Sequence, residues 1–287
     1  MKYQLGGISK GLVAVAVIML SMGAAQAGPI ILSGMDPEDH DTGGGTQGTD
    51  MISDVLEYVV ENATNNGAAG TGSNILMFGP SGGIGADSIN ASTIATGLGY
   101  TMTVVSSVVD IAAQSLAGFD AIYMPTSDSD VSGGLTDAQV HAINARSADI
   151  VSFVNAGGGL AAFAQNVDHG YGWFPLGGLL TTNLGSGGIS GIELTALGST
   201  ILSPSATAVE PFHTTFDGPA GFFGLSVLAD ETATTNRALI IGGGQGTVIT
   251  PNPLPEPATV LLFAAGLLGL AGFARRRKNS VKSEMVC

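Results

Sequence analysis

The sequence predicts an α/β domain with a mostly parallel, doubly wound sheet over residues 28–252. Two observations point to it. Short runs of four or five apolar residues recur along the chain, and segments with helical periodicity lie between them. An apolar run without alternation is typical of a strand buried on both faces, as in a parallel sheet covered by helices. About 225 residues suit one such domain.

The first half of the domain should begin with a strand at 29–32, followed by an acidic, glycine-rich loop. Residues 49–64 place apolar side chains at helical spacing, with Thr49 or Asp50 as the N-cap. The further elements expected here are strands at 74–78, 101–106 and 119–124 and helices at 87–98 and 111–117.

The second half should open with one long helix over Leu135–Ala156, capped by Thr136 and ended by three consecutive glycines. A strand at 160–163 follows. The pattern then loosens through residue 200. Two late strands are expected, at 225–228 and 238–241.

The first 27 residues have the organisation of a secretory signal peptide. A basic start with Lys2 and Lys10 precedes the apolar run 11–20, and Ala25-Gln26-Ala27 forms an A-x-A cleavage site. Ser21 and Gly23 end the run too early for a spanning helix. The mature chain should therefore begin near Gly28, after the Sec translocon and signal peptidase have acted.

The C-terminal segment combines three unlike features in a fixed order. Pro255, Glu256 and Pro257 lead into the apolar segment 258–274, and Arg275, Arg276 and Arg277 follow. As a helix, these seventeen residues, with Thr259 as the only polar side chain, cross most of a bilayer, and the arginines stay on the cytoplasmic side.

Residues 253–278 resemble the PEP-CTERM sorting signal of Gram-negative bacteria. The resemblance implies a temporary anchor in the inner membrane that an exosortase cuts. It also implies a final place at the cell surface or in the extracellular matrix, biofilm or polysaccharide.

Basic residues concentrate in the two terminal segments. Between Lys10 and Arg275 only Arg146 and Arg237 are basic, whereas the same span holds 22 of the 23 acidic residues. So acidic a domain repels phosphate and anionic lipid, which argues against nucleic-acid binding. The only cysteine is Cys287, beyond the sorting signal, so the domain has neither a disulfide nor a thiol nucleophile.

The stretch 135–165, LTDAQVHAINARSADIVSFVNAGGGLAAFAQ, resembles class I glutamine amidotransferase-like domains, including the trehalose-utilisation type. NILMFGP and FDAIYMPTSD resemble their first and third strands, and PFHTTFDGP a late histidine loop. The resemblance implies a flavodoxin-like fold. It does not extend to the active site, because Ala164, Gln165 and Asn166 occupy the elbow that carries the catalytic cysteine. The His-x-Glu pair is also missing, so no catalytic residue is assigned.

The loop that starts at Asp128 follows the template of an EF-hand. Asp128, Asp130, Ser132 and Thr136 supply oxygens at positions 1, 3, 5 and 9, and a glycine stands at position 6. Gln139 replaces the bidentate glutamate, so a Ca²⁺ site here should be weak. The alternative is an ordinary acidic loop in which Thr136 only caps the helix.

A second acidic segment, 35–41, contains Asp36, Glu38 and Asp39 together with a histidine. Its oxygens suit Ca²⁺ or a transition metal, although the spacing matches no defined motif. A solvated loop is the alternative. If 29–32 is a strand, this segment leaves the same sheet edge as Asp128 and Asp130 and faces them.

Other polar positions near the expected strand ends are candidate ligand contacts. Gly79 and Ser81 lie in a glycine-rich strand-to-helix turn whose N–H groups suit an anion. Gln165 and His169 lie near the elbow, and His213 lies near Glu210. For each of them an ordinary loop or packing role is the alternative.

Two functions from different classes follow. One is a non-catalytic binding domain for Ca²⁺ or glycan on an exported protein. The other is a secreted hydrolase that uses a metal or Asp36, Asp128, His169 and His213. The second requires these side chains to converge on one substrate atom.

Overall fold

The structure is a computed structural model of the whole chain. The chain divides into two compact units, Met1–Ile249 and Thr250–Cys287. The described residues all belong to the first unit and are 27–38, 47–65, 73–79, 91–126, 134–163, 180–183, 191–207, 214–216, 225–231 and 237–243. None of the helices in these ranges is both long and apolar enough for a membrane span. The predicted signal peptide, apart from Ala27, and the predicted 258–274 helix lie outside them.

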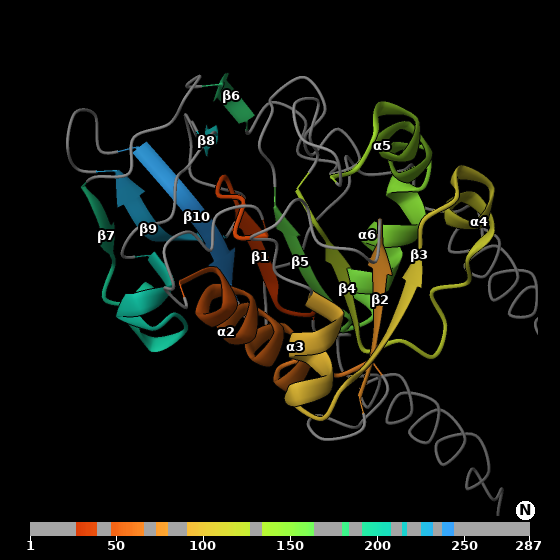
Figure 1. Cartoon of the computed structure of the whole chain (residues 1–287), viewed down its shortest axis with the longest axis horizontal. Helices are drawn as coiled ribbons and strands as arrows, with labels where there is room; N and C mark the ends of the chain where they lie inside the picture. Colours follow the sequence, from red (N-terminus) through yellow and green to blue (C-terminus); the bar gives the residue numbers. More distant parts are fainter. Residues whose placement is uncertain are drawn as a thin grey trace, which may run out of the picture. The chain divides into compact units, whose positions relative to one another are not determined.

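Five parallel strands form one half of a sheet (Figure 1). Their order across the sheet follows the chain only in part, since the first strand lies beside the fifth. The order is β3 (Thr101–Val105), β2 (Asn74–Phe78), β4 (Ala121–Met124), β5 (Gly159–Phe163) and β1 (Ile30–Ser33). Every residue of β1, β4 and β5 is buried, as strands covered on both faces require.

The other half of the sheet is antiparallel and begins with β10 (Arg237–Gly243), which pairs with β1. β8 and β9 both pair with β10, β6 pairs with β8, and β7 pairs with β9. Their bounds are β6 Leu180–Asn183, β7 Ile192–Leu194, β8 Thr214–Phe216 and β9 Ser226–Glu231. The predicted α/β class with parallel strands is confirmed, and the antiparallel extension is an addition to it.

Helices cover both faces of the parallel half (Figure 1). Successive residues of one strand serve opposite cores: Leu76 and Phe78 pack with one set of helices, and Ile75 and Met77 with the other. The first set is α4 (Val108–Ala113), α5 (Asp137–Asn144) and α6 (Ser147–Asn155), and the second is α2 (Gln47–Glu61) and α3 (Ala91–Gly97). Two short 3₁₀ turns, η1 (Gly198–Thr200) and η2 (Pro204–Thr207), follow β7.

The single long helix predicted over Leu135–Ala156 is wrong, because the chain breaks between α5 and α6. Ala145 ends α5, and Arg146 leaves the helical conformation with φ −101° and ψ 14°. Arg146 N–H donates to Ile143 O at 2.9 Å, which is a 3₁₀-type contact, and α6 restarts with Ile150 N–H on Arg146 O. The break turns the Arg146 side chain inward, where it is 8% exposed. Gly157, at φ 100°, then ends α6 as predicted.

Candidate functional site at the carboxyl edge of the sheet

A buried carboxyl group lies just beyond the carboxyl ends of β1 and β4. Glu38, five residues after β1, is 3% exposed. The Tyr123 hydroxyl donates to Glu38 Oε1 at 2.5 Å, and the Thr126 hydroxyl donates to Oε2 at 3.0 Å. Tyr123 belongs to β4 and Thr126 follows it. Both carboxyl oxygens of Glu38 are therefore used to join the segment after β1 to the segment after β4.

The environment of Glu38 favours the protonated carboxyl. Burial is the largest influence and raises the pKa of Glu38 from 4.5 to about 7. The hydrogen bonds from Tyr123 and Thr126 oppose this shift, and the nearby charge of Asp36 adds to it. The pKa of Tyr123 is itself raised well above its usual range by burial and by the adjacent carboxylate. Glu38 consequently changes its protonation state near neutral pH.

A second acid of the same segment and two further chain segments meet at this edge. Asp36 is buried two residues before Glu38. The Phe163 ring, at the end of β5, lies 5.5 Å from the Tyr123 ring. Thr214, the first residue of β8, donates its N–H to Gly34 O at 3.2 Å. The residues that flank the predicted ligand-bearing segments thus lie together at the carboxyl ends of the parallel strands. This is where parallel α/β sheets place their ligands.

Thr136, the predicted ninth position of a Ca²⁺ loop, caps helix α5. Its hydroxyl accepts the Gln139 N–H at 3.4 Å, and the Gln139 side chain accepts the Thr136 N–H at 2.8 Å. This reciprocal pair is a capping box. Gln139 Nε2 also donates to Ser106 O at 2.6 Å. The alternative role foreseen for Thr136 is therefore present, and its metal role stays a prediction.

Gly79 follows β2 at the same edge, close to Pro125. Its φ is 138°, and a Cβ at this position would lie 2.8 Å from the Pro125 ring. The Gly79 N–H donates to Val105 O at 3.0 Å, so this N–H is already used within the sheet. The remaining predicted site residues lie outside the described residues: Asp39, Ser81, Asp128, Asp130, Ser132, Gln165, His169 and His213.

Within the ranges that the structure describes, no group of three or more His, Cys, Asp or Glu side chains is arranged to hold a metal ion. Of the two predicted acidic segments, 35–41 is described only to Glu38, and the loop from Asp128 only from Gly134 onward. The described residues therefore cover only part of the two acidic segments.

The sequence prediction missed Tyr123 and Thr126. Tyr123 reads as a core residue of an apolar strand, and a buried hydroxyl needs a polar partner there. That requirement could have indicated an acidic partner for Tyr123, because the strand ends near two acidic segments. It does not select Glu38 over the neighbouring acids, since the choice depends on the turn after β1. Chemically, the cluster can anchor two loops and hold a proton near neutral pH.

Comparison with known proteins identifies one segment of the chain. The model of the PEP-CTERM protein-sorting motif matches residues 253–278. No curated protein and no solved structure matches the chain significantly. The match confirms the predicted sorting signal and leaves the resemblance of the central domain a prediction. The chain thus carries a PEP-CTERM sorting motif and is an exported protein, anchored in the membrane before an exosortase processes it.

Proposed function

We propose that the α/β domain is a non-catalytic binding domain of a cell-surface or extracellular-matrix protein, and that it binds Ca²⁺ through the acidic segments at the carboxyl edge. Glycan is the second ligand class for the same edge. A Gram-negative source, export by the Sec route and contact with exopolysaccharide belong to this proposal. Residues 1–27, 28–252 and 253–278 are its signal peptide, binding domain and sorting signal.

One observation supports the Ca²⁺ proposal most directly, namely the pair of hydrogen bonds that Glu38 accepts. Glu38 stands next to Asp39, and Thr126 stands two residues before Asp128. The contact of 3.0 Å between them ties the two acidic segments together at their stems. Oxygen ligands from two tied loops suit Ca²⁺, which takes six to eight oxygens in flexible geometry.

The strand order supports a flavodoxin-like scaffold for this function. Counted from Asn74–Phe78, four of the five parallel strands follow the order 2-1-3-4, and β1, the first strand of the chain, takes the fifth place. Flavodoxin-like sheets have this order and bind ligands beyond the carboxyl ends of their strands. A glutamine amidotransferase-like domain without its cysteine would keep such an edge as a binding surface.

A calcium titration of the purified full-length chain in mild detergent tests the proposal. Isothermal calorimetry should show saturable heat with Ca²⁺ and much less with Mg²⁺, which tolerates flexible oxygen sites poorly. The double variant Asp128→Asn/Asp130→Asn should lose this heat. The matched control Glu57→Gln/Glu61→Gln removes the same charge from the exposed surface of α2 and should bind normally. Equal loss in both variants, or silence in the wild type, contradicts the Ca²⁺ site.

The raised pKa of Glu38 favours the second candidate, a hydrolase. A carboxyl that titrates at about 7 suits a general acid or base. Its burial, and the use of both oxygens by Tyr123 and Thr126, suit an anchor better. Release of reducing ends from soluble polysaccharides separates the two. Turnover that Glu38→Gln abolishes without weakening Ca²⁺ binding would establish the hydrolase.

A further inference from the structure

An open cavity of about 630 Å³ lies beside α6. Its walls are α6, the segment that joins α4 to β4, and the turn after α2. The α4–β4 segment and the turn after α2 lead into the amino ends of β4 and β2. The cavity is therefore at the opposite end of the strands from the candidate Ca²⁺ site, and the volume falls in the range of small-molecule sites.

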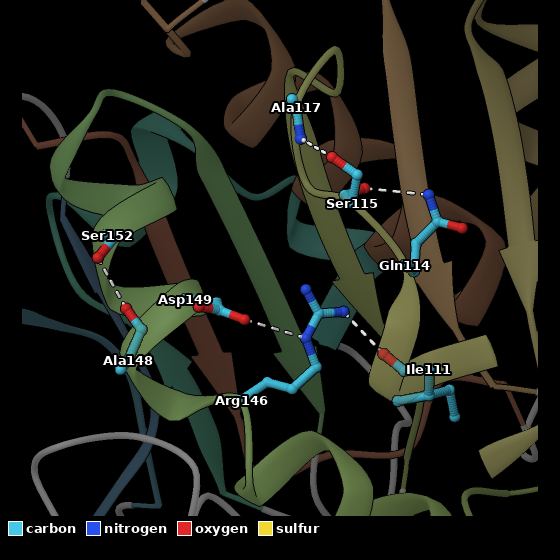
Figure 2. A network of polar contacts seen from close by, with 8 residues as sticks. All are labelled: Ile111, Gln114, Ser115, Ala117, Arg146, Ala148, Asp149 and Ser152. Atoms are coloured by element: carbon cyan, nitrogen blue, oxygen red, sulfur yellow. Dashed lines mark hydrogen bonds and ion pairs between the residues drawn. The ribbon is translucent and has the colours of Figure 1, made fainter. Parts of the chain in front are cut away.

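Arg146 supplies a fixed positive charge to this cavity (Figure 2). Nη1 donates to Ile111 O at 2.7 Å, and Nε lies 3.4 Å from Asp149 Oδ2. The guanidinium also lies 5.5 Å from the centre of the Phe78 ring. These contacts hold the side chain in one position although it starts at the break between two helices.

The third guanidinium nitrogen, Nη2, remains available for a ligand. Among the described residues, none accepts a hydrogen bond from it, and Figure 2 shows it without a contact, on the side where Ser115 is drawn. Asp149 neutralises Arg146 only weakly, because its side chain is 65% exposed. Arg237, the other basic residue of the domain, pairs with the buried Glu231 at 3.8 Å. Arg146 thus faces this cavity with one guanidinium nitrogen that no described residue engages.

The other walls offer hydrogen-bonding groups and an aromatic surface. Gln114 donates to Ser115 O at 3.0 Å, which leaves its carbonyl oxygen open to a donor. Ser115 Oγ accepts the Ala117 N–H at 3.2 Å and keeps its proton for donation. Phe153 lines the same space. Groups of this kind recognise hydroxyls and the apolar face of a sugar ring.

We propose that this cavity binds a sugar acid, with its carboxylate on Nη2 of Arg146 and its hydroxyls on Gln114 and Ser115. A bare carboxylate would fill only a small part of 630 Å³. A polyanion is disfavoured because the chain carries a net charge of −14 and the cavity itself contains Asp149. A sugar with a single negative charge, free or at the end of a glycan chain, fits both the volume of the cavity and its charge. This site is independent of Ca²⁺ at the carboxyl edge.

The test uses the full-length chain in detergent, glucuronate as the probe, and glucose and acetate as comparisons. Ligand-observed NMR should show glucuronate binding at least about tenfold more tightly than either comparison, since each lacks one half of the recognition. Arg146→Gln should abolish binding. Because that variant also removes contacts to Ile111 and Phe78, a second variant is needed.

Ser152→Glu places a carboxylate at the cavity wall without touching the core. The Ser152 hydroxyl only donates to Ala148 O at 2.8 Å, and the residue is exposed. Repulsion should weaken glucuronate binding about tenfold or more. The control Ser199→Glu adds the same charge at an exposed serine that donates to Thr195 O at 3.0 Å in the same i,i−4 pattern. It should bind glucuronate normally.

Four results overturn the proposal: no binding of glucuronate, equal binding of acetate, equal binding of glucose, or equal weakening by Ser152→Glu and Ser199→Glu. None of them bears on the Ca²⁺ titration, since Asp128 and Asp130 follow the carboxyl end of β4 and neither lines the cavity. Conversely, loss of Ca²⁺ heat in Asp128→Asn/Asp130→Asn should leave glucuronate binding intact.

Discussion

Replacing Glu38 by glutamine should change how the stability of the domain depends on pH. Glutamine keeps the shape of the protonated carboxyl and can still engage the Tyr123 and Thr126 hydroxyls, but it does not titrate. Any difference in pH dependence between the wild type and Glu38→Gln therefore reports the ionisation of Glu38. All other titrating groups are shared by the two proteins and cancel.

The expected size follows from the pKa of Glu38 in the two states. The folded-state pKa of about 7 exceeds the ordinary value of 4.5, so the folded chain holds the proton more tightly than the unfolded chain. This contribution to stability is complete below pH 4.5 and is lost as pH rises to about 7. A difference of about 2.5 units corresponds to about 3 kcal/mol, at about 1.4 kcal/mol per unit.

Urea unfolding of both proteins between pH 4 and pH 8, followed by circular dichroism, measures this difference. The unfolding free energy of the variant minus that of the wild type should rise by about 3 kcal/mol across this range, most of it between pH 4.5 and 7. A difference that stays constant with pH would show that Glu38 ionises in the fold as it does in water. A falling difference would show that the Glu38 carboxylate is stabilised, and either result refutes the reasoning.

Three further outcomes are expected. Tyr123→Phe removes a hydrogen bond that lowers the pKa of Glu38, so the upper end of the pH window in urea unfolding should move above 7. The control is Tyr58→Phe, which changes a half-buried tyrosine of α2 and should leave the pH window of unfolding unchanged. Gly159→Ala puts a Cβ 2.1 Å from Val59 O of α2 and should lower the unfolding free energy by about 1–3 kcal/mol or more. The control Gly97→Ala has no atom within 4 Å and should raise it by up to about 1 kcal/mol. If both glycine variants unfold alike, the close packing of β5 on α2 is wrong. Alanine at residues 255–257 should prevent cleavage, so that mass spectrometry of membrane fractions finds the chain with its C-terminal tail still attached. Normal processing of that variant would contradict the role of the motif.

The sequence predicted those elements of the fold whose residues are buried on both sides. β4 and β5 are apolar runs and β2 is one after its exposed first residue, Asn74; burial in a parallel sheet is the usual reason for such runs. β6, β7 and β8 have only three or four residues each and include several threonines, so they carry no periodic signal. Their pairing comes from β10 and β9, which are distant in the sequence.

The sequence predicts that the candidate site lies at the carboxyl edge of the sheet, but it does not predict the contacts within that site. The alternation of strands and helices places the segments after β1 and β4 on one side of the sheet. Which acid turns inward is a property of the turn after β1, where both Asp36 and Glu38 are buried. The inward position of Arg146 was equally hidden, because it depends on the break between α5 and α6.

The position of β1 between β5 and β10 has a consequence for export. β1, which follows the predicted signal peptide, pairs on one side with β10, the last strand that the structure describes before the sorting motif. If the predicted signal peptide leads the chain across the membrane, Ile30 emerges early, and the edge of β1 that pairs with β10 stays unpaired until Gly243 has emerged. In that case β1 and β10 can pair only when little more than the tail remains to be translocated. Anchoring by that tail then coincides with the final step of sheet assembly.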